Sequence, residues 1–509
     1  MSEPQSAWQA SLPFYTSKLF RDVQLSGIFK DSKTFADASP KLSWQSAINA
    51  YLSESAQANF SLAEFILRFF TIPEPISLTS DVRCESVSEY IEVMWSTLTR
   101  QPDEDNNSSL IPLAEPYIVP GGRFREIYYW DTYFTALGLK ESGHEKLITS
   151  MLNNFLTVQQ SVGCIPNGNR AYYHTRSQPP VMGLLAQLVL EDNATADLKA
   201  RCLHGLHQEY QFWMDGAEAL TDVQPAFRRV VKMPDGSVLN RYYDDVATPR
   251  PESYREDIEA AAIHQQESQA LFFRDLRAAC ESGWDFSSRW FEDPADLNTI
   301  QTTQIVPVDV NSLLVMLERQ LARLYQESGD DSQAARFSQK AEQRIHALHR
   351  YMWCEKDGLF KDYNWQKAHQ TSVKSLATVL PLFAEIAGEE QAQTIAGHLE
   401  SSFLKAGGLV TTLNTTGQQW DSPNGWAPLQ WFAVAGLRNY GYHMLAREVM
   451  ERWLNCVEHY FAAHHVMLEK YNVCNIETAA GGGEYDVQLG FGWTNGVTRM
   501  FYSLLTGSR

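Results

Sequence analysis

Amphipathic helix periodicity recurs along most of this chain after residue about 85, and it limits the possible folds more than any other feature. One buried helix face follows the i, i+3, i+4, i+7 spacing through Val310, Leu313, Leu314, Leu317, Leu321 and Leu324. A Ser-Gly-Asp-Asp break at 328–331 can end that helix and cap another, whose face is Ala334, Phe337, Ala341, Ile345, Leu348 and Met352. Similar patterns cover 143–160, 194–214, 255–280 and 444–461. These segments predict helical hairpins in series.

Strand patterns are scarce, and the best candidates are 223–231 and 464–473. No repeat of fixed period is present, although loops rich in Gly, Pro, Trp and Asn recur from 120 to 495. A closed ring of hairpins can bring such loops to one mouth. We therefore expect an all-α ring in one domain over 1–509, with an N-terminal arm, about 1–80, packed on it. The polar stretch 102–109 is expected to be a loop within this domain.

The charge balance limits the possible partners. The chain has 61 acidic and 42 basic residues, a net charge of -19, and such a surface repels nucleic acid and anionic lipid. No apolar run approaches the roughly 20 residues of a membrane span. We expect neither nucleic acid nor a membrane as a partner, and we expect a monomer.

The cysteines and the N-terminus bear on the compartment. Seven cysteines are scattered without a CxxC pair, which predicts reduced, mostly buried thiols. Glu3 precedes any basic residue, and no apolar stretch with a cleavage site follows, so a secretory signal is not expected. Together these features favour the cytoplasm.

Three loop segments carry residues that packing alone does not explain. The first is 120–134, where two glycines precede a helix. If this helix begins near 126, Trp130 and Asp131 share one face with Ile127 and Phe134. A carboxylate among aromatic rings needs partners, which a polyol or Arg123 could supply. A core aspartate bonded to nearby backbone is the alternative.

The second segment, 419–428, holds two tryptophans and Asp421 in a Pro/Gly turn. Flat rings such as that of Trp420, beside hydrogen-bonding side chains, suit a sugar, which has an apolar face and a polar edge. A tight turn between helices is the alternative.

The third segment joins 468–471 to the glycine-rich stretches 481–485 and 490–496. It lacks the Gly-Lys-Ser/Thr ending and the preceding strand of a phosphate loop. Between the segments lie Asn167, Arg176, 250–252 and 282–286. Arginines, carboxylates and tryptophans combined in loops indicate a neutral, hydroxyl-rich ligand.

The sequence gives weaker support for a metal site or for a catalytic nucleophile. His204/His207 and His346/His349 have a possible ligand spacing, but each pair lacks an obvious third ligand and lies in an ordinary amphipathic pattern. The chain has no GxSxG elbow, and Cys164 lacks a convincing partner. Acid–base catalysis by carboxylates remains, and we expect no metal and no cofactor.

At this point the motifs resemble a known family, the inverting trehalases among the glycoside hydrolases. The family signature PGGRFxExYxWDxY matches from Pro120 to Tyr133, and QWDxPxGWxP matches from Gln419 to Pro428. Shorter resemblances cover 19–37, 250–253, 282–286, 469–471 and 484–485.

The resemblance implies an (α/α)6 toroid that hydrolyses trehalose to two glucose molecules. By motif position, Asp285 corresponds to the catalytic acid and Glu469 to the catalytic base. The residues on sugar-binding positions are Arg123, Phe124, Trp130, Asp131, Asn167, Arg176, Arg250, Glu252, Gly283 and Glu484. The family usually has four or more glycines before Glu484, whereas this chain has three, which bears on the mobility of a loop that commonly covers the substrate.

The residues themselves, apart from the family resemblance, are suited to inverting hydrolysis. Inversion needs one carboxylic acid and one carboxylate in opposite protonation states. Trp284 and Phe286 flank Asp285 and could raise its pKa, while Lys470 could keep Glu469 charged. The alternatives are a phosphorylase of trehalose or another α-glucoside, and a trehalose-binding sensor without catalysis; the presence of both carboxylates disfavours the sensor.

Overall fold

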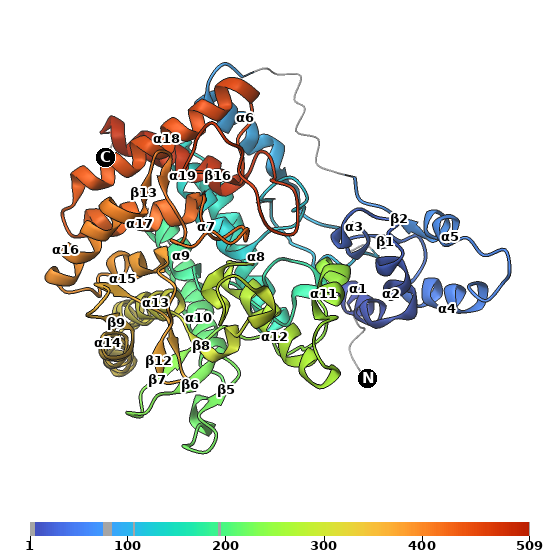
Figure 1. Cartoon of the computed structure of the whole chain (residues 1–509), viewed down its shortest axis with the longest axis horizontal. Coiled ribbons are helices and arrows are strands. Elements are labelled where there is room, and N and C mark those ends of the chain that lie inside the picture. Colours follow the sequence, from blue (N-terminus) through green and yellow to red (C-terminus); the bar gives the residue numbers. More distant parts are fainter. Residues whose placement is uncertain (1–5, 75–83, 105–106, 192–194, 508–509) are drawn as a thin grey trace.

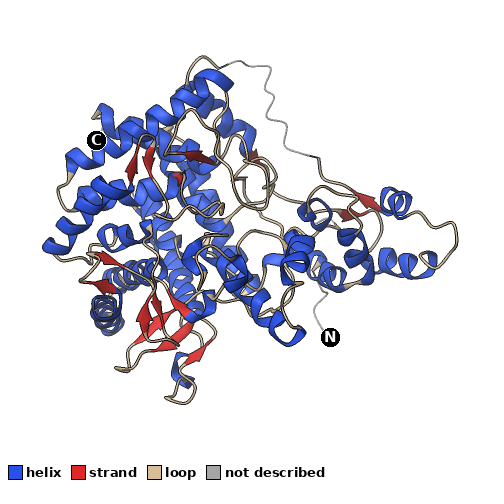
Figure 2. Ribbon diagram, in the orientation of Figure 1, coloured by secondary structure: helices blue, strands red, loops and turns tan. Residues whose placement is uncertain are grey.

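The computed structural model describes residues 6–74, 84–104, 107–191 and 195–507. Its described residues are mainly helical, with small two- and three-stranded sheets between the helices (Figure 2). Among them no helix is long and apolar enough to cross a membrane. The helix faces predicted from periodicity are present, and two of them are α13 (Val308–Glu327) and α14 (Asp331–Met352).

Twelve helices alternate between an inner and an outer ring. The inner helices contact one another in a closed cycle. They are α7 (Tyr129–Glu141), α9 (Met182–Leu190), α13, α15 (Leu380–Phe383), α17 (Ala427–Asn439) and α19 (Gly492–Thr506). The outer helices are α6 (Val87–Leu98), α8 (Glu145–Val162), α10 (Ala196–Trp213), α14, α16 (Glu389–His398) and α18 (His443–His464). This arrangement is the expected (α/α)6 toroid (Figure 1).

Burial distinguishes the two rings. In α7 every residue from Tyr129 to Leu139 is buried, because this helix is covered on all sides. The ring closes where α7 meets α19: a Cβ at Gly138 would lie 2.5 Å from the Cα of Gly496. Glycine at both positions therefore allows the two helices to approach closely.

The arm lies beside the ring and contacts it through three elements (Figure 1). It comprises α1 (Ala7–Ser11), α2 (Lys18–Leu25), α3 (Ser32–Ala36), α4 (Trp44–Glu54) and α5 (Leu62–Phe69). Helix α2 packs on α11 (Tyr254–Ala261), α3 on η4 (Pro251–Ser253), and α1 on η2 (Ala171–Tyr173). We propose that the chain forms one domain, with this arm packed on the closed ring.

Buried ion pairs fix the arm to the ring. Lys33 Nζ lies 2.8 Å from Asp37 and 2.6 Å from Glu126, and all three side chains are buried. Arg170 Nε lies 3.2 Å from Glu126 and 3.6 Å from Asp37. Removing one partner from such a cluster leaves an uncompensated buried charge, so the cluster specifies where α3 docks.

Small sheets join the loops. They pair β1 (Ser39–Pro40) with β2 (Phe70–Thr71), β3 (Thr99–Arg100) with β4 (Tyr117–Ile118), β9 (Trp353–Cys354) with β10 (Leu359–Phe360), and β13 (Leu404–Lys405) with β14 (Gly408–Leu409). The three-stranded sheets are β5 (Ala226–Phe227), β6 (Val230–Lys232) and β7 (Val238–Asn240), and β8 (Ile305–Val306), β11 (Tyr363–Asn364) and β12 (His369–Gln370). The pair β15 (Asn424–Trp426) and β16 (Lys470–Asn472) sets Trp426 opposite Lys470, which joins two of the predicted site segments.

Two sequence expectations were wrong in detail. The helix expected over 255–280 is interrupted between α11 and α12 (Gln266–Ser282), where Gln265 caps the second helix. The strand expected over 464–473 is shorter, because α18 continues to His464 and β16 begins at Lys470. The strand expected over 223–231 corresponds to β5 and the first part of β6. Part of the 102–109 loop, residues 105–106, lies outside the described residues.

Candidate active site

One cavity collects residues from segments that are far apart in the sequence. Of the predicted site residues, its lining includes Arg123, Phe124, Trp130, Asp131, Asn167, Arg176, Arg250, Glu252, Gly283, Asp285, Trp420 and Glu484. The lining also contains residues not singled out from the sequence, namely Lys33, Tyr128, Tyr173, Gln178, Ser253, Cys280, Trp426, Tyr485, Phe491 and Trp493. Most of these side chains come from loops and first helical turns, whereas Lys33 comes from the arm and Cys280 from the last turn of α12 (Gln266–Ser282).

The first turn of α7 presents Trp130 and Asp131 to the cavity. The helix begins at Tyr129 and not near 126, because Glu126 to Tyr128 pair with other loops instead of continuing the helix: the Ile127 amide donates to Asn169 Oδ1 at 2.9 Å. Gly283, at φ +77°, lies against the Trp130 ring, and a Cβ there would come within 2.7 Å of ring atoms. Glycine at this position therefore allows the loop to pass close to the Trp130 indole.

Tryptophans form an aromatic wall of the site. The Trp420 and Trp426 rings are stacked, with centroids 4.0 Å apart and planes at 3°. The Trp284 ring, outside the cavity lining, is stacked 5.5 Å from Trp420, and Trp130 lies 6.0 Å from Trp420. Such flat apolar surfaces suit the C–H face of a pyranose ring.

Asp285 follows the C-terminus of α12 and lines the cavity. Burial raises the pKa of its carboxyl to about 7; Arg250 opposes this shift and the charge of Glu484 adds to it. A carboxyl with such a pKa keeps a proton near neutral pH, as a general acid must.

Glu469 lies immediately before β16 and is completely buried. Its Oε1 is 3.4 Å from Lys470 Nζ, and no described residue donates a well-formed hydrogen bond to either carboxylate oxygen. Burial raises the pKa of this carboxyl, and the neighbouring Lys470 opposes the shift. The Trp493 indole N–H donates to the Glu469 carbonyl at 2.9 Å, which fixes the backbone beside the cavity.

Asp131 connects the two carboxyls electrostatically. Its pKa is raised well above the usual range, first by burial and then by the charges of Asp285 and Glu469. The same two carboxylates raise the pKa of Tyr485, after burial. Glu469 is not among the residues that line the cavity, but these interactions show that its charge acts on the same group of residues as Asp285.

Every cation that lines the cavity is already close to a carboxylate. Arg176 Nη2 lies 2.5 Å from Glu252, and Arg250 Nη2 lies 2.5 Å from Asp257 and 2.9 Å from Glu484. The remaining two are Lys33, described above, and Arg123, 3.9 Å from Asp31. Such pairing leaves little net positive charge for an anionic ligand.

Several polar atoms of the site nevertheless lack a hydrogen-bond partner within the described part of the chain. They include Arg123 Nε, Arg176 Nη1 and Glu252 Oε2, which are all buried. Buried polar groups are normally satisfied, so donors and an acceptor left open in one cavity fit a ligand that both donates and accepts hydrogen bonds. Sugar hydroxyls have this property.

Asp421 does not line the cavity, and its place among the sugar-binding residues stays a prediction. Its carboxylate accepts hydrogen bonds from Ser287 Oγ at 2.8 Å and the Ser288 amide at 2.9 Å, and from two threonines, Thr412 at 2.8 Å and Thr416 at 2.5 Å. These bonds occupy both oxygens. Asp421 therefore ties the loop after Asp285 to the 412–421 loop.

One histidine of each pair noted in the sequence has an ordinary hydrogen-bond partner. His207 Nδ1 lies 2.7 Å from the Tyr325 hydroxyl, and His349 Nε2 lies 3.0 Å from the Ile386 carbonyl. Within the described ranges, no group of three or more His, Cys, Asp or Glu side chains is arranged to hold a metal ion.

Some of the cavity residues that were not predicted individually lie inside the three loop segments identified from the sequence. Tyr128, Trp426, Tyr485 and Trp493 belong to those segments, and aromatic density was the available signal. Lys33 lies about 90 residues before the first motif, within the 19–37 stretch of family resemblance, and that resemblance was the available signal for it.

A sequence model of the trehalase family matches residues 27–506. The chain belongs to the trehalase family. This family membership makes the chain a glycoside hydrolase, and the match spans both the helical ring and most of the arm.

Solved structures agree with this fold. The neutral trehalase Nth1 from Saccharomyces cerevisiae is 29% identical, with a TM-score of 0.65 over 76% of this chain and 73% of the yeast chain. The GH63 mannosylglycerate hydrolase from Thermus thermophilus is 18% identical, with a TM-score of 0.55 over 82% of this chain and 100% of the other. The second likeness concerns the fold alone. The predicted (α/α)6 toroid is confirmed.

Proposed function

We propose that this member of the trehalase family is an α,α-trehalase that hydrolyses trehalose to two glucose molecules with inversion. The observation that supports it most is an aromatic cavity that Asp285 and Asp131 line and in which Arg123, Arg176 and Glu252 leave hydrogen-bonding atoms open. We further propose that it acts as a monomer in the cytoplasm without a metal or cofactor.

In this mechanism Asp285 protonates the glycosidic oxygen as the bond breaks. Glu469 takes a proton from a water molecule that attacks the anomeric carbon from the opposite face. The pKa of about 7 keeps Asp285 protonated at mildly acidic pH, and Lys470 favours the ionised form of Glu469. The arginines and the tryptophan wall orient the two sugar rings, which places the scissile bond between acid and base.

The paired cations favour hydrolysis over phosphorolysis. A phosphorylase needs a site for an inorganic phosphate dianion, whereas Arg176, Arg250 and Lys33 each lie within 2.9 Å of a carboxylate oxygen. A sugar, being neutral, does not require a free cation.

Proton NMR of the first product tests the proposed reaction. Purified protein with trehalose and no phosphate is expected to release one α-glucose and one β-glucose per trehalose, because water attacks one ring with inversion and the other ring leaves unchanged. Glucose 1-phosphate as the product, a requirement for phosphate, or release of α-glucose alone would contradict the proposal.

The pH dependence of kcat/KM is expected to be bell-shaped. Activity needs Asp285 protonated, so it falls as the pH rises through about 7, the pKa to which burial raises this carboxyl. It also needs Glu469 ionised, and since burial raises that pKa, the acidic limb lies above the range of an exposed glutamate. Initial rates across the pH range measure both limbs. Loss of activity only on the acidic side would argue against a protonated catalytic acid.

A further inference from the structure

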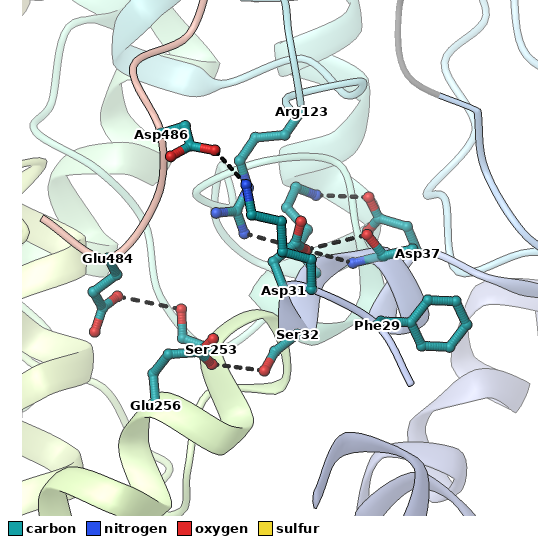
Figure 3. Close-up of polar contacts among 12 residues, drawn as sticks. Phe29, Asp31, Ser32, Asp37, Arg123, Ser253, Glu256, Glu484 and Asp486 are labelled. Atoms are coloured by element: carbon teal, nitrogen blue, oxygen red, sulfur yellow. Dashed lines mark hydrogen bonds and ion pairs between the residues drawn. The ribbon is translucent and has the colours of Figure 1, made fainter. Parts of the chain in front are cut away.

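The first turn of α3 and the residues before it, 29–33, lie between α11 and the loop 484–488 (Figure 3), and Lys33 of this segment lines the cavity. On the α11 side, Arg255 donates hydrogen bonds to the Phe29 carbonyl at 3.3 Å and the Lys30 carbonyl at 2.7 Å. Ser32 Oγ donates to Glu256 Oε2 at 2.6 Å. The backbone of 29–33 is therefore held by α11.

The Lys33 side chain holds the same segment through its hydrogen bonds to other residues. Its ammonium group has three donors, and they are used by Asp37, Glu126 and the Tyr172 hydroxyl at 2.8, 2.6 and 3.0 Å. Glu126 in turn accepts a hydrogen bond at 2.6 Å from Tyr128, which lines the cavity. Because the backbone of residues 29–33 is held in this way, the positions from which the Lys30 and Asp31 side chains extend are fixed.

Asp31 faces Arg123. Its Oδ1 lies 3.9 Å from Arg123 Nη2, and the same oxygen caps α3 by accepting the Thr34 amide at 2.9 Å. Arg123 also contacts the loop 484–488: its amide donates to Gln488 Oε1 at 2.8 Å, and its guanidinium lies 4.7 Å from the Tyr485 ring centroid. Arg123 is thus placed between the arm and this loop.

Lys30 contacts the loop directly. Its Nζ lies 2.6 Å from Asp486 Oδ2, and both side chains are more than 80% exposed. On the other side of the loop, Glu484 lies 2.9 Å from Arg250 and accepts a hydrogen bond from Ser253 at 3.3 Å (Figure 3). The loop is therefore bonded to the arm at its middle residue, Asp486, and to Arg250 and Ser253 at Glu484.

We propose that Asp31 and Lys30 are positioning residues of the sugar site. Asp31 orients the Arg123 guanidinium toward the cavity, and Lys30 holds the loop 484–488 closed so that Glu484 and Tyr485 line it. The inference rests on the proposed function in one respect, that the ligand of this cavity is trehalose. The arm therefore contributes to substrate binding and not to folding alone.

Asp31→Asn tests the first part, since asparagine caps a helix as well as aspartate and the change removes only the charge. KM for trehalose is expected to rise by about two- to fivefold, the range of a partly exposed ion pair, with kcat changed by less than about twofold. The free energy of unfolding, measured with urea, should not change. Lys199→Met, which removes a comparable exposed pair with Glu327 at 3.2 Å, is the control and should leave KM unchanged. An unchanged KM in Asp31→Asn would overturn this part.

Swapping the charges of Lys30 and Asp486 tests the second part of the proposal, the role of Lys30, and this test needs no substrate. The amides of Arg123 and Glu469 donate to Gln488 at 2.8 and 3.0 Å, so their hydrogen exchange reports how often the loop leaves the cavity. Lys30→Asp and Asp486→Lys, each alone, should speed exchange in peptides containing these amides by about two- to fivefold, measured by mass spectrometry. The double variant Lys30→Asp/Asp486→Lys should restore the rate of the unaltered protein.

The results separate this inference from the proposed function. If the double variant exchanges as fast as the single variants, Lys30 does not hold the loop, whatever reaction the protein catalyses. If the exchange rates behave as expected but trehalose is not hydrolysed, the positioning role stands and the substrate assignment fails.

Discussion

Asp285→Asn is expected to reduce kcat for trehalose by a factor of about 10² to 10⁴, because glucose leaves poorly without a proton from the catalytic acid. Fluoride needs much less protonation. The variant should therefore retain a clearly larger fraction of its activity on α-glucosyl fluoride, and parallel initial-rate assays on the two substrates measure the difference. Asparagine has nearly the shape of aspartate, so the loss would reflect the proton.

Asp222→Asn is a suitable control, because Asp222 is exposed and pairs with Lys232 at 2.8 Å outside the cavity. It should leave both activities unchanged. Equal fractional losses on trehalose and on the fluoride in Asp285→Asn would contradict the assignment of Asp285 as the acid.

Glu469→Gln is expected to abolish both activities, again by about 10² to 10⁴, because water must be activated whichever group leaves. Glu469 is completely buried beside Lys470, so glutamine keeps the volume and removes the charge that accepts the proton. The same two assays measure the effect, and circular dichroism checks that the variant is folded.

The two variants together decide the roles. Rescue by fluoride in Glu469→Gln, with none in Asp285→Asn, would mean that the acid and the base are exchanged. If Glu469→Gln kept its activity on trehalose, a different carboxylate would have to activate the water.

Much of the fold followed from local pattern. The faces of α13 and α14 were visible as apolar residues at helical spacing, because each helix packs one stripe against its neighbour. The interruption between α11 and α12 was not visible, since residues 262–265 contain neither proline nor glycine. The inner helix α7 has almost no apolar stripe, because it is buried all round, and its start was misplaced by three residues.

The site was partly predictable for a different reason. Motif resemblance proposed Asp285 and Glu469, of which Asp285 lines the cavity, but which side chains reach the cavity depends on contacts across the helical ring. Asp421 lies between Trp420 and Trp426 in the sequence, as a sugar ligand could, yet five hydroxyl or amide donors bind its carboxylate and join two loops through it. Lys33 is the opposite case, an ordinary lysine in sequence that tertiary contacts bring to the cavity.

The charges of Asp285 and Glu469 have a consequence for Asp131, a third carboxyl of the same site. Both charges add to the effect of burial on its pKa, so Asp131 favours its protonated form. A protonated carboxyl donates one hydrogen bond and accepts others, whereas a carboxylate only accepts. Asp131 can therefore offer a sugar hydroxyl a donor as well as an acceptor, and it adds no negative charge to a site that already holds two carboxyls for catalysis.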